Sequence, residues 1–376
     1  MAQTGERKKY LDAAKGWGIN MIVFGHITAL GNPIDRYFAT YKLAIFFFVS
    51  GYLLFITGSM KKYSVGQFAR RHLRSLMLPY AGYSALILLY AVTADFYRGK
   101  PLAKITGRIL NHGYEFVTLR GHSTMWFLPC LFLAQMLLVI IIRLPVFIRL
   151  LSLVLPVFSS IYFDNLLHQL KGQLDSSAYK LVSYPILTVS KAIFAFWYVF
   201  VGYLCACLLC KKYKQEETGR RSGTLREIVK FAAGLGLSLL TVWLSTKMKS
   251  VDINSMILGT KPLLLMVAGV SGSLGAVLVL EYIEKWLPLR YLCWTGRNSL
   301  IIMATHGTLG FKQLCIRGWK DFYGLAAKAG MKYYLDCIGI QCHLMLIECG
   351  VVSLITGYLP WLSGRGRSGS ANRTAS

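Results

Sequence analysis

The amino-acid sequence predicts an all-α integral membrane protein, a polytopic bundle of about ten transmembrane helices. Three observations predict this class. Of the 376 residues, 55% are hydrophobic and 15% are charged, which excludes an ordinary soluble domain and a disordered chain. Apolar runs of about 20 residues, the length that crosses a bilayer, recur along the chain. Short connections rich in Lys and Arg separate them.

The apolar runs can be placed in order along the sequence. The predicted spans are residues 14–31, 40–58, 76–94, 123–142, 146–163, 188–210, 228–246, 262–281, 298–314 and 336–362. Two long connections, 95–122 and 164–187, separate some of them. These connections are long enough to hold short helices.

The distribution of positive charge orients these spans. With the amino terminus inside, the inner segments hold 24 of the 42 Lys and Arg residues. Those segments are residues 1–15, 60–75, 143–149, 211–230, 285–297 and 364–376. Cytoplasmic connections are enriched in these residues, so both termini are predicted to be cytoplasmic. One membrane domain, 1–362, is expected, followed by a disordered cytoplasmic tail, 363–376.

The formal net charge of +26 raises the question of a nucleic-acid partner. Membrane orientation and attraction to anionic lipids explain most of this charge. We therefore expect no nucleic-acid partner, and we place the protein in the cell membrane as a multi-pass protein.

The nine cysteines lie mainly in apolar stretches, as membrane packing predicts. Cys207 and Cys210 have CxxC spacing, but no second pair or histidine follows at zinc spacing. Neither a disulfide framework nor a metal site is predicted.

The first span and the residues directly before it carry three ionisable groups, Asp12, Lys15 and His26, among mostly apolar residues. At about 100° per residue, Lys15 and His26 lie within about 20° of each other and about 16 Å apart along the helix axis. Asp12 lies on nearly the same face and is expected to pair with Lys15. Because ionisable side chains facing lipid are costly, this alignment predicts a hydrated site.

Each of these groups has two interpretations. His26 has a side chain that titrates near neutrality, so it can take a proton from a sugar hydroxyl that attacks a thioester. Alternatively, it packs the helix through a hydrogen bond to a neighbour. Lys15 is suited to binding phosphate near the cytoplasmic face, and the alternative is a contact with lipid headgroups.

The second span and the basic segment after it add further candidates. Ser50 and Gly51 form a small pair that lets helices approach closely, and the Ser50 hydroxyl can bond a partner backbone. Arg71 and Arg74 share a helical face at i and i+3, and guanidinium groups bind phosphate bidentately. Positive-inside anchoring is the alternative for both arginines.

Later spans add polar groups and one aromatic residue. Trp126 is a site candidate or an interfacial belt residue. Asn298 and Ser299 are polar groups at a predicted helix start, able to cap it, and His306 lies about two turns further on. A histidine within a span needs a partner, and His306 is a candidate to face the same cavity as His26.

Several ordered motifs resemble those of the acyltransferase-3 superfamily of membrane O-acyltransferases. In its first-helix signature a basic residue precedes a catalytic histidine by ten intervening positions, as Lys15 precedes His26. The other similar segments are Phe46–Leu53, Arg70–Tyr80, Met125–Phe132, Ala195–Tyr203 and Thr295–His306. In the last segment Met303 stands where tyrosine is common. The resemblance covers residues 8–362, and the nearest subgroup is that of the fucose 4-O-acetylase-like acetyltransferases.

The resemblance implies transfer of acetyl from acetyl-CoA to a carbohydrate hydroxyl of a surface polysaccharide, exopolysaccharide or glycolipid precursor. His26 would be the catalytic base, and Lys15, Arg71 and Arg74 would bind the donor. The supporting or substrate-binding candidates are Asp12, Ser50, Trp126, Asn298, Ser299 and His306. Acetyl-CoA is then a substrate, and no permanently bound cofactor is expected. The partners are donor, acceptor and membrane lipids, and a homo-oligomer is allowed.

The alternative function is a polytopic transporter or flippase of glycan intermediates. Ten spans with intramembrane charge would also serve that function. Transporters often contain inverted repeats and broken helices in matching positions, and the sequence shows neither. A non-catalytic scaffold is a third class, which predicts no coenzyme A binding.

Overall fold

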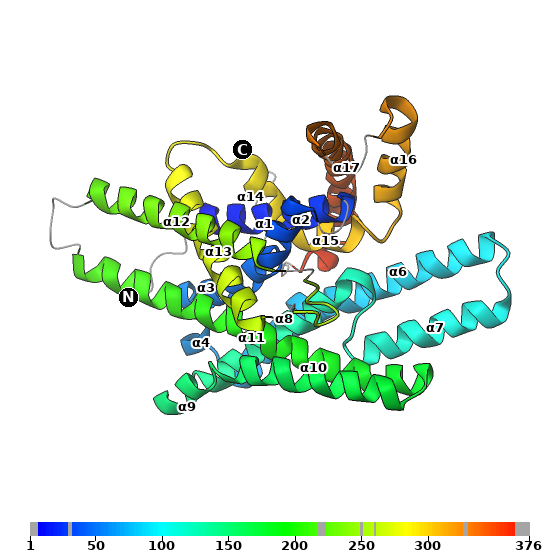
Figure 1. Cartoon of the computed structure of the whole chain (residues 1–376), viewed down its shortest axis with the longest axis horizontal. Coiled ribbons are helices and arrows are strands. Elements are labelled where there is room, and N and C mark those ends of the chain that lie inside the picture. The colour runs from blue at the N-terminus through cyan, green and yellow to red at the C-terminus, as the bar shows by residue number, and fades with distance from the viewer. Residues whose placement is uncertain are drawn as a thin grey trace. The chain divides into compact units, whose positions relative to one another are not determined.

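The computed structural model describes residues 7–28, 32–216, 223–248, 251–258, 261–325 and 330–364. Helices make up nearly all of this part of the chain, whose β structure is one isolated antiparallel bridge between Asp252 and Ile257 (Figure 1). The predicted all-α class is therefore confirmed. Most of the predicted tail, residues 365–376, lies outside the described residues.

Seven helical segments of the described chain are long and apolar enough to cross a membrane. They are Pro33–Ile56, Val65–Tyr97, Ser123–Ile141, Ser176–Cys210, Thr224–Thr246, Pro262–Ile283 and Met331–Tyr358. Each overlaps one of the predicted spans, which supports the membrane class. The count of about ten and the cytoplasmic placement of both termini stay predictions.

Three predicted spans have no counterpart among these seven segments. They are residues 14–31, 146–163 and 298–314. The first corresponds to α1 (Lys9–Ile27), which begins in the charged amino-terminal stretch. The second is divided between α9 (Val146–Leu151) and α10 (Leu155–Gln173). The third is divided between α15 (Ser299–Thr305) and α16 (Phe311–Tyr323). The prediction missed these divisions because apolar composition does not reveal where a helix breaks.

The contacts divide the chain into two compact units that are interleaved in sequence. Unit 1 comprises Met1–Val65, Ala134–Leu166 and Ser190–Ser299. Unit 2 comprises Gly66–Leu133, Leu167–Val189 and Leu300–Ser376. Helices α8 (Phe127–Ile141), α10 and α11 (Ser176–Glu216) each contribute several residues to both units.

In unit 1, α1 packs directly against α14 (Arg290–Arg297). Two glycines permit this approach. A Cβ at Gly16 would lie 1.9 Å from the Leu292 carbonyl oxygen, and one at Gly296 would lie 1.8 Å from the Asp12 carbonyl oxygen. The backbones therefore touch, so any side chain at these positions would push the helices apart.

A side-chain cap begins the helix that follows α1 in unit 1. The side chain of Asn32 accepts a hydrogen bond from the Asp35 backbone N–H and caps α2 (Pro33–Tyr41). The apolar α3 (Ala44–Ile56) follows, and then α4 (Ser59–Lys62).

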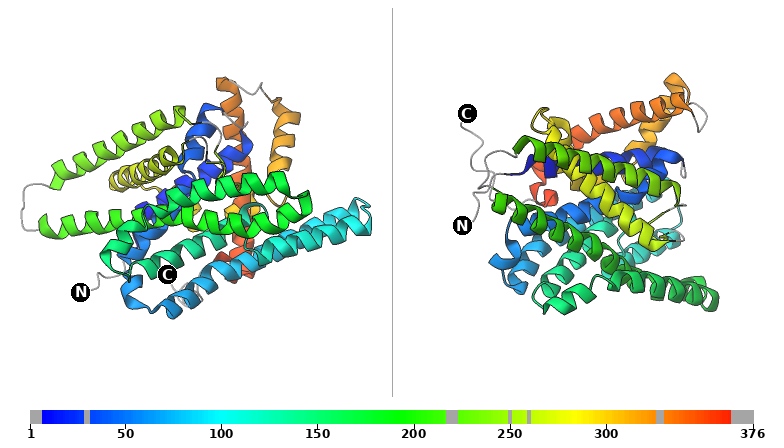
Figure 2. Two further views of the ribbon diagram at one scale, coloured as in Figure 1. Left: turned by 60° about the horizontal axis from the view of Figure 1, so that its bottom comes forward. Right: turned by 60° about the vertical axis from the view of Figure 1, so that its left-hand side comes forward.

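Two long helices lie side by side in unit 1, α12 (Gly223–Thr246) and α13 (Pro262–Ile283) (Figure 2). The hydroxyls of Thr241 and Ser271 lie 2.8 Å apart between them, in the buried interface. Such hydroxyl contacts suit a membrane interior, where each polar group needs a partner.

Unit 2 contains a helical rod paired with a shorter helix. α5 (Val65–His72, with Val65 in unit 1) continues through a π-helical turn, η1 (Leu73–Met77), into α6 (Leu78–Tyr97). α7 (Leu102–Val117) returns antiparallel beside α6 (Figure 1). The long predicted connection 95–122 thus contains a helix, as expected.

The turn between α6 and α7 is fixed by a buried carboxylate. Asp95, 2% exposed, lies 2.5 Å from Arg108 Nε and 2.7 Å from Lys100 Nζ. Near the other end of α7, the rings of Tyr80 and Phe116 stack with centroids 5.1 Å apart. These contacts hold the helix pair in register.

The carboxyl-terminal part of unit 2 contains α15 and α16, then α17 (Met331–Tyr358) and the 3-10 turn η3 (Pro360–Ser363). Thr305 Oγ1 donates to Glu348 Oε2 at 2.6 Å and joins the end of α15 to α17. Glu348 is fully buried, so its oxygens need partners within the protein, and this bond supplies one for Oε2.

Candidate functional site

A buried carboxylate surrounded by cations lies near the start of α1. Asp12 is 4% exposed and accepts a hydrogen bond from Arg7 Nε at 2.5 Å. Lys15 Nζ lies 3.0 Å from Asp12 Oδ1, and Arg297 Nε lies 3.4 Å from Asp12 Oδ2. The expected pairing of Asp12 with Lys15 is present. Three cations facing one carboxylate leave this end of α1 with an excess of positive charge.

The cations also determine the ionisation of Asp12. Burial alone would raise the pKa of its carboxyl group. The hydrogen bond from Arg7 and the charge of Lys15 outweigh burial, so the pKa of Asp12 is lowered from its ordinary value of 3.8. The same hydrogen bond raises the pKa of Arg7. Asp12 is therefore a fixed negative charge near neutral pH.

Lys15 and His26 belong to one uninterrupted helix, so the predicted spacing of about 16 Å holds. The Lys15 side chain is 24% exposed, and His26 in the last turn of α1 is exposed. A reactant can therefore approach the imidazole without local unfolding.

A second ion pair lies next to the last turn of α1, and the sequence analysis missed it. Lys42 Nζ lies 3.6 Å from Asp35 Oδ1. A Cβ on Gly25 would lie 2.8 Å from that Nζ, so the absence of a side chain directly before His26 leaves room for the lysine. The glycine of the Gly25-His26 pair was the available signal.

A hydrogen-bonded network joins α1 to α14 between Lys15 and His26. Asn20 Nδ2 donates to the Gly16 carbonyl at 2.8 Å and to Thr295 Oγ1 at 3.3 Å. The Tyr291 hydroxyl donates to Asn20 Oδ1 at 2.7 Å. The late Thr295-Gly296-Arg297 segment and the first helix therefore form one cluster. Asn20, Tyr291 and Thr295 were not among the predicted site residues.

Asn298 lies directly before Ser299, the first residue of α15, so it stands at a helix start as predicted. It follows the last residue of α14, and its Nδ2 donates back to the Trp294 carbonyl at 3.0 Å. α14 ends here and Ser299 begins α15, so Asn298 closes the preceding helix. The capping of α15 by the Asn298 side chain stays a prediction.

Ser50 lies at a close helix contact, as predicted. A Cβ on Gly51 would lie 1.8 Å from the Val199 carbonyl oxygen, so α3 and α11 touch there. The Ser50 hydroxyl accepts a hydrogen bond from Gln135 Nε2 at 2.5 Å. Its partner is thus a side-chain amide of α8 and not a backbone group.

Arg71 and Arg74 are both exposed in unit 2. Arg71 belongs to α5, whereas Arg74 lies in the π-helical turn η1. The predicted shared face assumed an uninterrupted α-helix, and the wider π turn changes the angle between the two side chains. Both side chains reach solvent.

Trp126 and His306 are interior residues of unit 2. Trp126 is 5% exposed in the 3-10 turn η2 (Ser123–Trp126). His306 is fully buried, with its Nδ1 2.7 Å from the Ile302 carbonyl oxygen. Thr124 Oγ1 donates to the Met303 carbonyl at 2.9 Å and ties η2 to α15.

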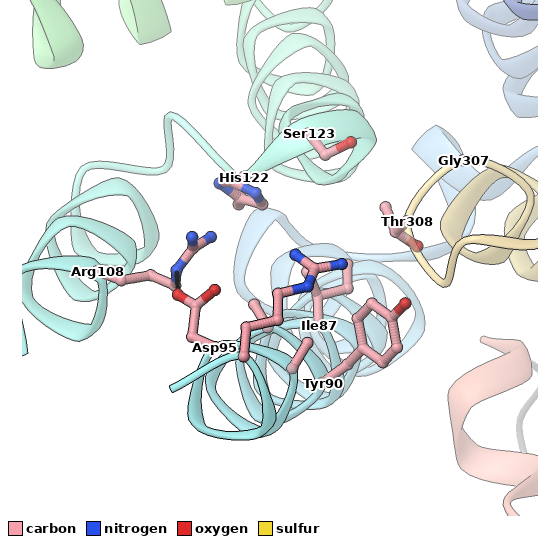
Figure 3. Close-up of a pocket in the computed structure, with 11 residues that line it drawn as sticks. Ile87, Tyr90, Asp95, Arg108, His122, Ser123, Gly307 and Thr308 are labelled. Carbon is pink, nitrogen blue, oxygen red and sulfur yellow. Dashed lines mark hydrogen bonds and ion pairs between the residues drawn. The ribbon is translucent and has the colours of Figure 1, made fainter. Parts of the chain in front are cut away.

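A polar cavity of about 260 Å³ lies in unit 2 (Figure 3). Its polar lining residues are Tyr90, Asp95, Arg98, Arg108, His122, Ser123 and Thr308. None of the predicted site residues lines it. The sequence held no motif here, because the lining comes from α6, α7, η2 and the segment after α15, far apart in the chain.

Seven helical segments of membrane-spanning length in the described chain define a helical membrane protein, whose first helix bears a cation cluster and an exposed imidazole. The model of the acyltransferase-3 family, described as an acyltransferase domain, matches residues 8–328, so the chain belongs to this family. Comparison with curated proteins and with solved structures gives no match. The predicted family is confirmed, and the fucose 4-O-acetylase-like subgroup stays a prediction.

Proposed function

We propose that the protein is a membrane O-acetyltransferase that moves acetyl from acetyl-CoA to a carbohydrate hydroxyl. Membership of the acyltransferase-3 family supports acyl transfer. The observation on which the proposal depends is α1 itself, which places an exposed imidazole about 16 Å along the axis from a cluster with excess positive charge.

The donor end is assigned to the cations. Coenzyme A carries phosphates and a long, slender pantetheine arm, and a cationic cluster binds phosphates near the membrane surface. Arg7, Lys15 and Arg297 exceed the charge of Asp12 by two, counted from the three ion pairs to that carboxylate. The predicted donor residues Arg71 and Arg74 belong to this proposal as well.

The reactive end is assigned to His26. Its neutral imidazole takes the proton of the acceptor hydroxyl while the hydroxyl oxygen attacks the thioester carbonyl carbon. The new C–O ester bond forms, the C–S bond breaks, and coenzyme A leaves as a thiol after the proton is returned. The assignment of a carbohydrate acceptor follows from the resemblance to the fucose 4-O-acetylase-like subgroup.

The test replaces the imidazole and measures acetyl transfer. In membranes containing the protein, His26→Ala should lower transfer of labelled acetyl from acetyl-CoA to glycan by at least about 100-fold, because a general base contributes about that much or more. His168→Ala is the matched control, since His168 is an exposed histidine on α10. Mass spectrometry of the glycan identifies the product by the added mass of one acetyl group.

Two results would count against the proposal. If the His26→Ala variant transferred acetyl at the wild-type rate, His26 would not be the catalytic base. Absence of acetylation by the wild type, with glycan movement across the bilayer instead, would favour the transporter or flippase.

A further inference from the structure

Two histidines and a glutamate converge at the end of α7. His112 and Glu115 lie three residues apart on one face of the helix, and His122 follows in the segment that leads to η2. The ligand atoms of these three residues lie within 4.8 Å of one another. His122 Nδ1 is 2.8 Å from Glu115 Oε2, the distance of a hydrogen bond, so a small separation of these two atoms would make room for a cation between them.

His112 is buried without a hydrogen bond. Its side chain is 6% exposed, and no residue in the described part of the chain makes a hydrogen bond with either ring nitrogen. Its ring instead stacks on that of His122 with centroids 3.8 Å apart. A neutral imidazole has one nitrogen lone pair that can bind a metal ion, and no described residue accepts or donates a hydrogen bond there.

The turn after α7 is built to return His122 to the helix. Leu119 and Ser123 have φ of 57° and 53°, which is costly for residues with a side chain. Gly121, with φ of 67°, donates its backbone N–H to the Glu115 carbonyl at 3.0 Å. A Cβ on Gly121 would lie 2.4 Å from the Trp126 backbone nitrogen, so only glycine fits there.

The carboxylate is also oriented. Asn111 Nδ2 donates to Glu115 Oε1 at 3.2 Å, while Oε2 faces His122. Groups that hold a metal-binding carboxylate in place in this way strengthen binding.

We propose that His112, Glu115 and His122 bind a late first-row divalent metal ion, with Zn²⁺ as the reference ion. Two imidazole nitrogens and one carboxylate oxygen are the donor set that such ions prefer, whereas Mg²⁺ and Ca²⁺ prefer oxygen alone. The ion replaces the proton between His122 Nδ1 and Glu115 Oε2, and the stacked rings turn so that one nitrogen of each faces the metal. This site is independent of the proposed acetyl transfer.

The pocket gives the proposed ion access to a ligand. His122 is both a member of the triad and part of the wall of the polar cavity, next to Ser123 (Figure 3). Three protein ligands leave a position open on a tetrahedral ion. Water or a small hydroxyl-bearing or anionic molecule from the cavity completes the coordination.

The experiment measures zinc directly in the full-length protein. The protein is purified in detergent with an affinity tag that lacks histidine, incubated with ZnCl₂, dialysed and analysed by elemental mass spectrometry. About one Zn²⁺ per chain is expected for the wild type, and His112→Ala, Glu115→Gln and His122→Ala should lose it. Asn111→Ala should weaken the affinity by about 10- to 100-fold, because it only positions the carboxylate.

Controls separate the triad from other zinc-binding groups. His168→Ala and the double variant Cys207→Ser, Cys210→Ser should retain the zinc of the wild type. As a check on folding, ZnCl₂ should raise the Tm of the wild type and leave that of Glu115→Gln unchanged. Zinc retained by the triad variants, zinc lost in the cysteine variant, or no zinc on the wild type would each overturn the proposal.

Discussion

At the scale of single residues, Asp12 organises the start of the first helix. It lies within 3.4 Å of a cationic nitrogen on each of Arg7, Lys15 and Arg297, and it is itself buried. Without the carboxylate, three cations would repel one another in a confined space. We therefore expect most of the contribution of Asp12 to folding stability to be electrostatic.

We expect Asp12→Asn to lower the free energy of unfolding by about 1 to 3 kcal/mol, less than for a fully buried pair because its partners are partly exposed. In detergent, the Tm should fall by roughly 2 to 8 °C. Asp321→Asn is the control, because Asp321 is exposed on α16. An equal Tm for Asp12→Asn and the wild type would contradict this role.

The difference in Tm between the wild type and Asp12→Asn should depend on pH with a definite sign. The pKa of Asp12 is lower in the folded protein than its ordinary value of 3.8, so its stabilisation is complete above that value and is lost as pH falls below it. The Tm difference between wild type and Asp12→Asn should therefore be constant near neutrality and shrink below about pH 4. A difference that grew on acidification would contradict the assignment.

The same residue shows what a sequence can predict about a site. The pairing of Asp12 with Lys15 follows from helical spacing and is present. The contact of Asp12 with Arg297 joins residues 285 positions apart, and periodicity carries no information on such contacts. The triad of His112, Glu115 and His122 was missed for a related reason, since the turn after α7, not spacing, brings His122 back.

At the scale of elements, glycines set how closely the helices of unit 1 pack. Gly296 on α14 has no space for a side chain, since its Cβ would lie 1.8 Å from the Asp12 carbonyl oxygen. A backbone atom cannot move aside as a side chain can. The α1–α14 contact therefore tolerates no substitution at this position.

Gly296→Ala should destabilise the protein by more than about 2 kcal/mol, measured as a fall in Tm in detergent, and should lower acetyl transfer because α1 shifts. Gly236→Ala on α12 is the matched control. Nothing lies within 4 Å of a Cβ there, so this change should leave the Tm unchanged or raise it. Equal Tm values for the two variants would show that α1 and α14 do not touch.

Seven of the predicted spans overlap helical segments of membrane length because each is dominated by one apolar run. The predicted spans 146–163 and 298–314 were also apolar, but breaks around Ser152 and after Thr305 divide them. A helix break depends on local backbone geometry and contacts. An average of hydrophobicity over about 20 residues does not detect it.

At the scale of the whole molecule, the continuous helix formed by η1 and α6 separates two arginines of unit 2 along its axis. Arg74 lies at one end of the rod and Arg98 directly follows the other. Their separation along the axis is about 35 Å, more than the roughly 30 Å of a hydrocarbon core. If the rod spans the bilayer, the two arginines lie on opposite membrane faces.

Cysteine labelling in sealed, right-side-out vesicles tests this. An impermeant maleimide should label the Arg98→Cys variant directly and the Arg74→Cys variant only after permeabilisation, because basic connections favour the cytoplasm. Locating the label by peptide mass spectrometry makes removal of the native cysteines unnecessary. Labelling of both variants from the same side would show that the rod does not cross.

The length of α11 has a consequence for the membrane surface. Its 41 residues give a helix about 60 Å long, twice the depth of the lipid interior. At the tilts of up to about 40° that transmembrane helices adopt, this length does not fit within the lipid interior. If α11 crosses the bilayer, at least one of its ends therefore projects into the headgroup layer or the water beyond it.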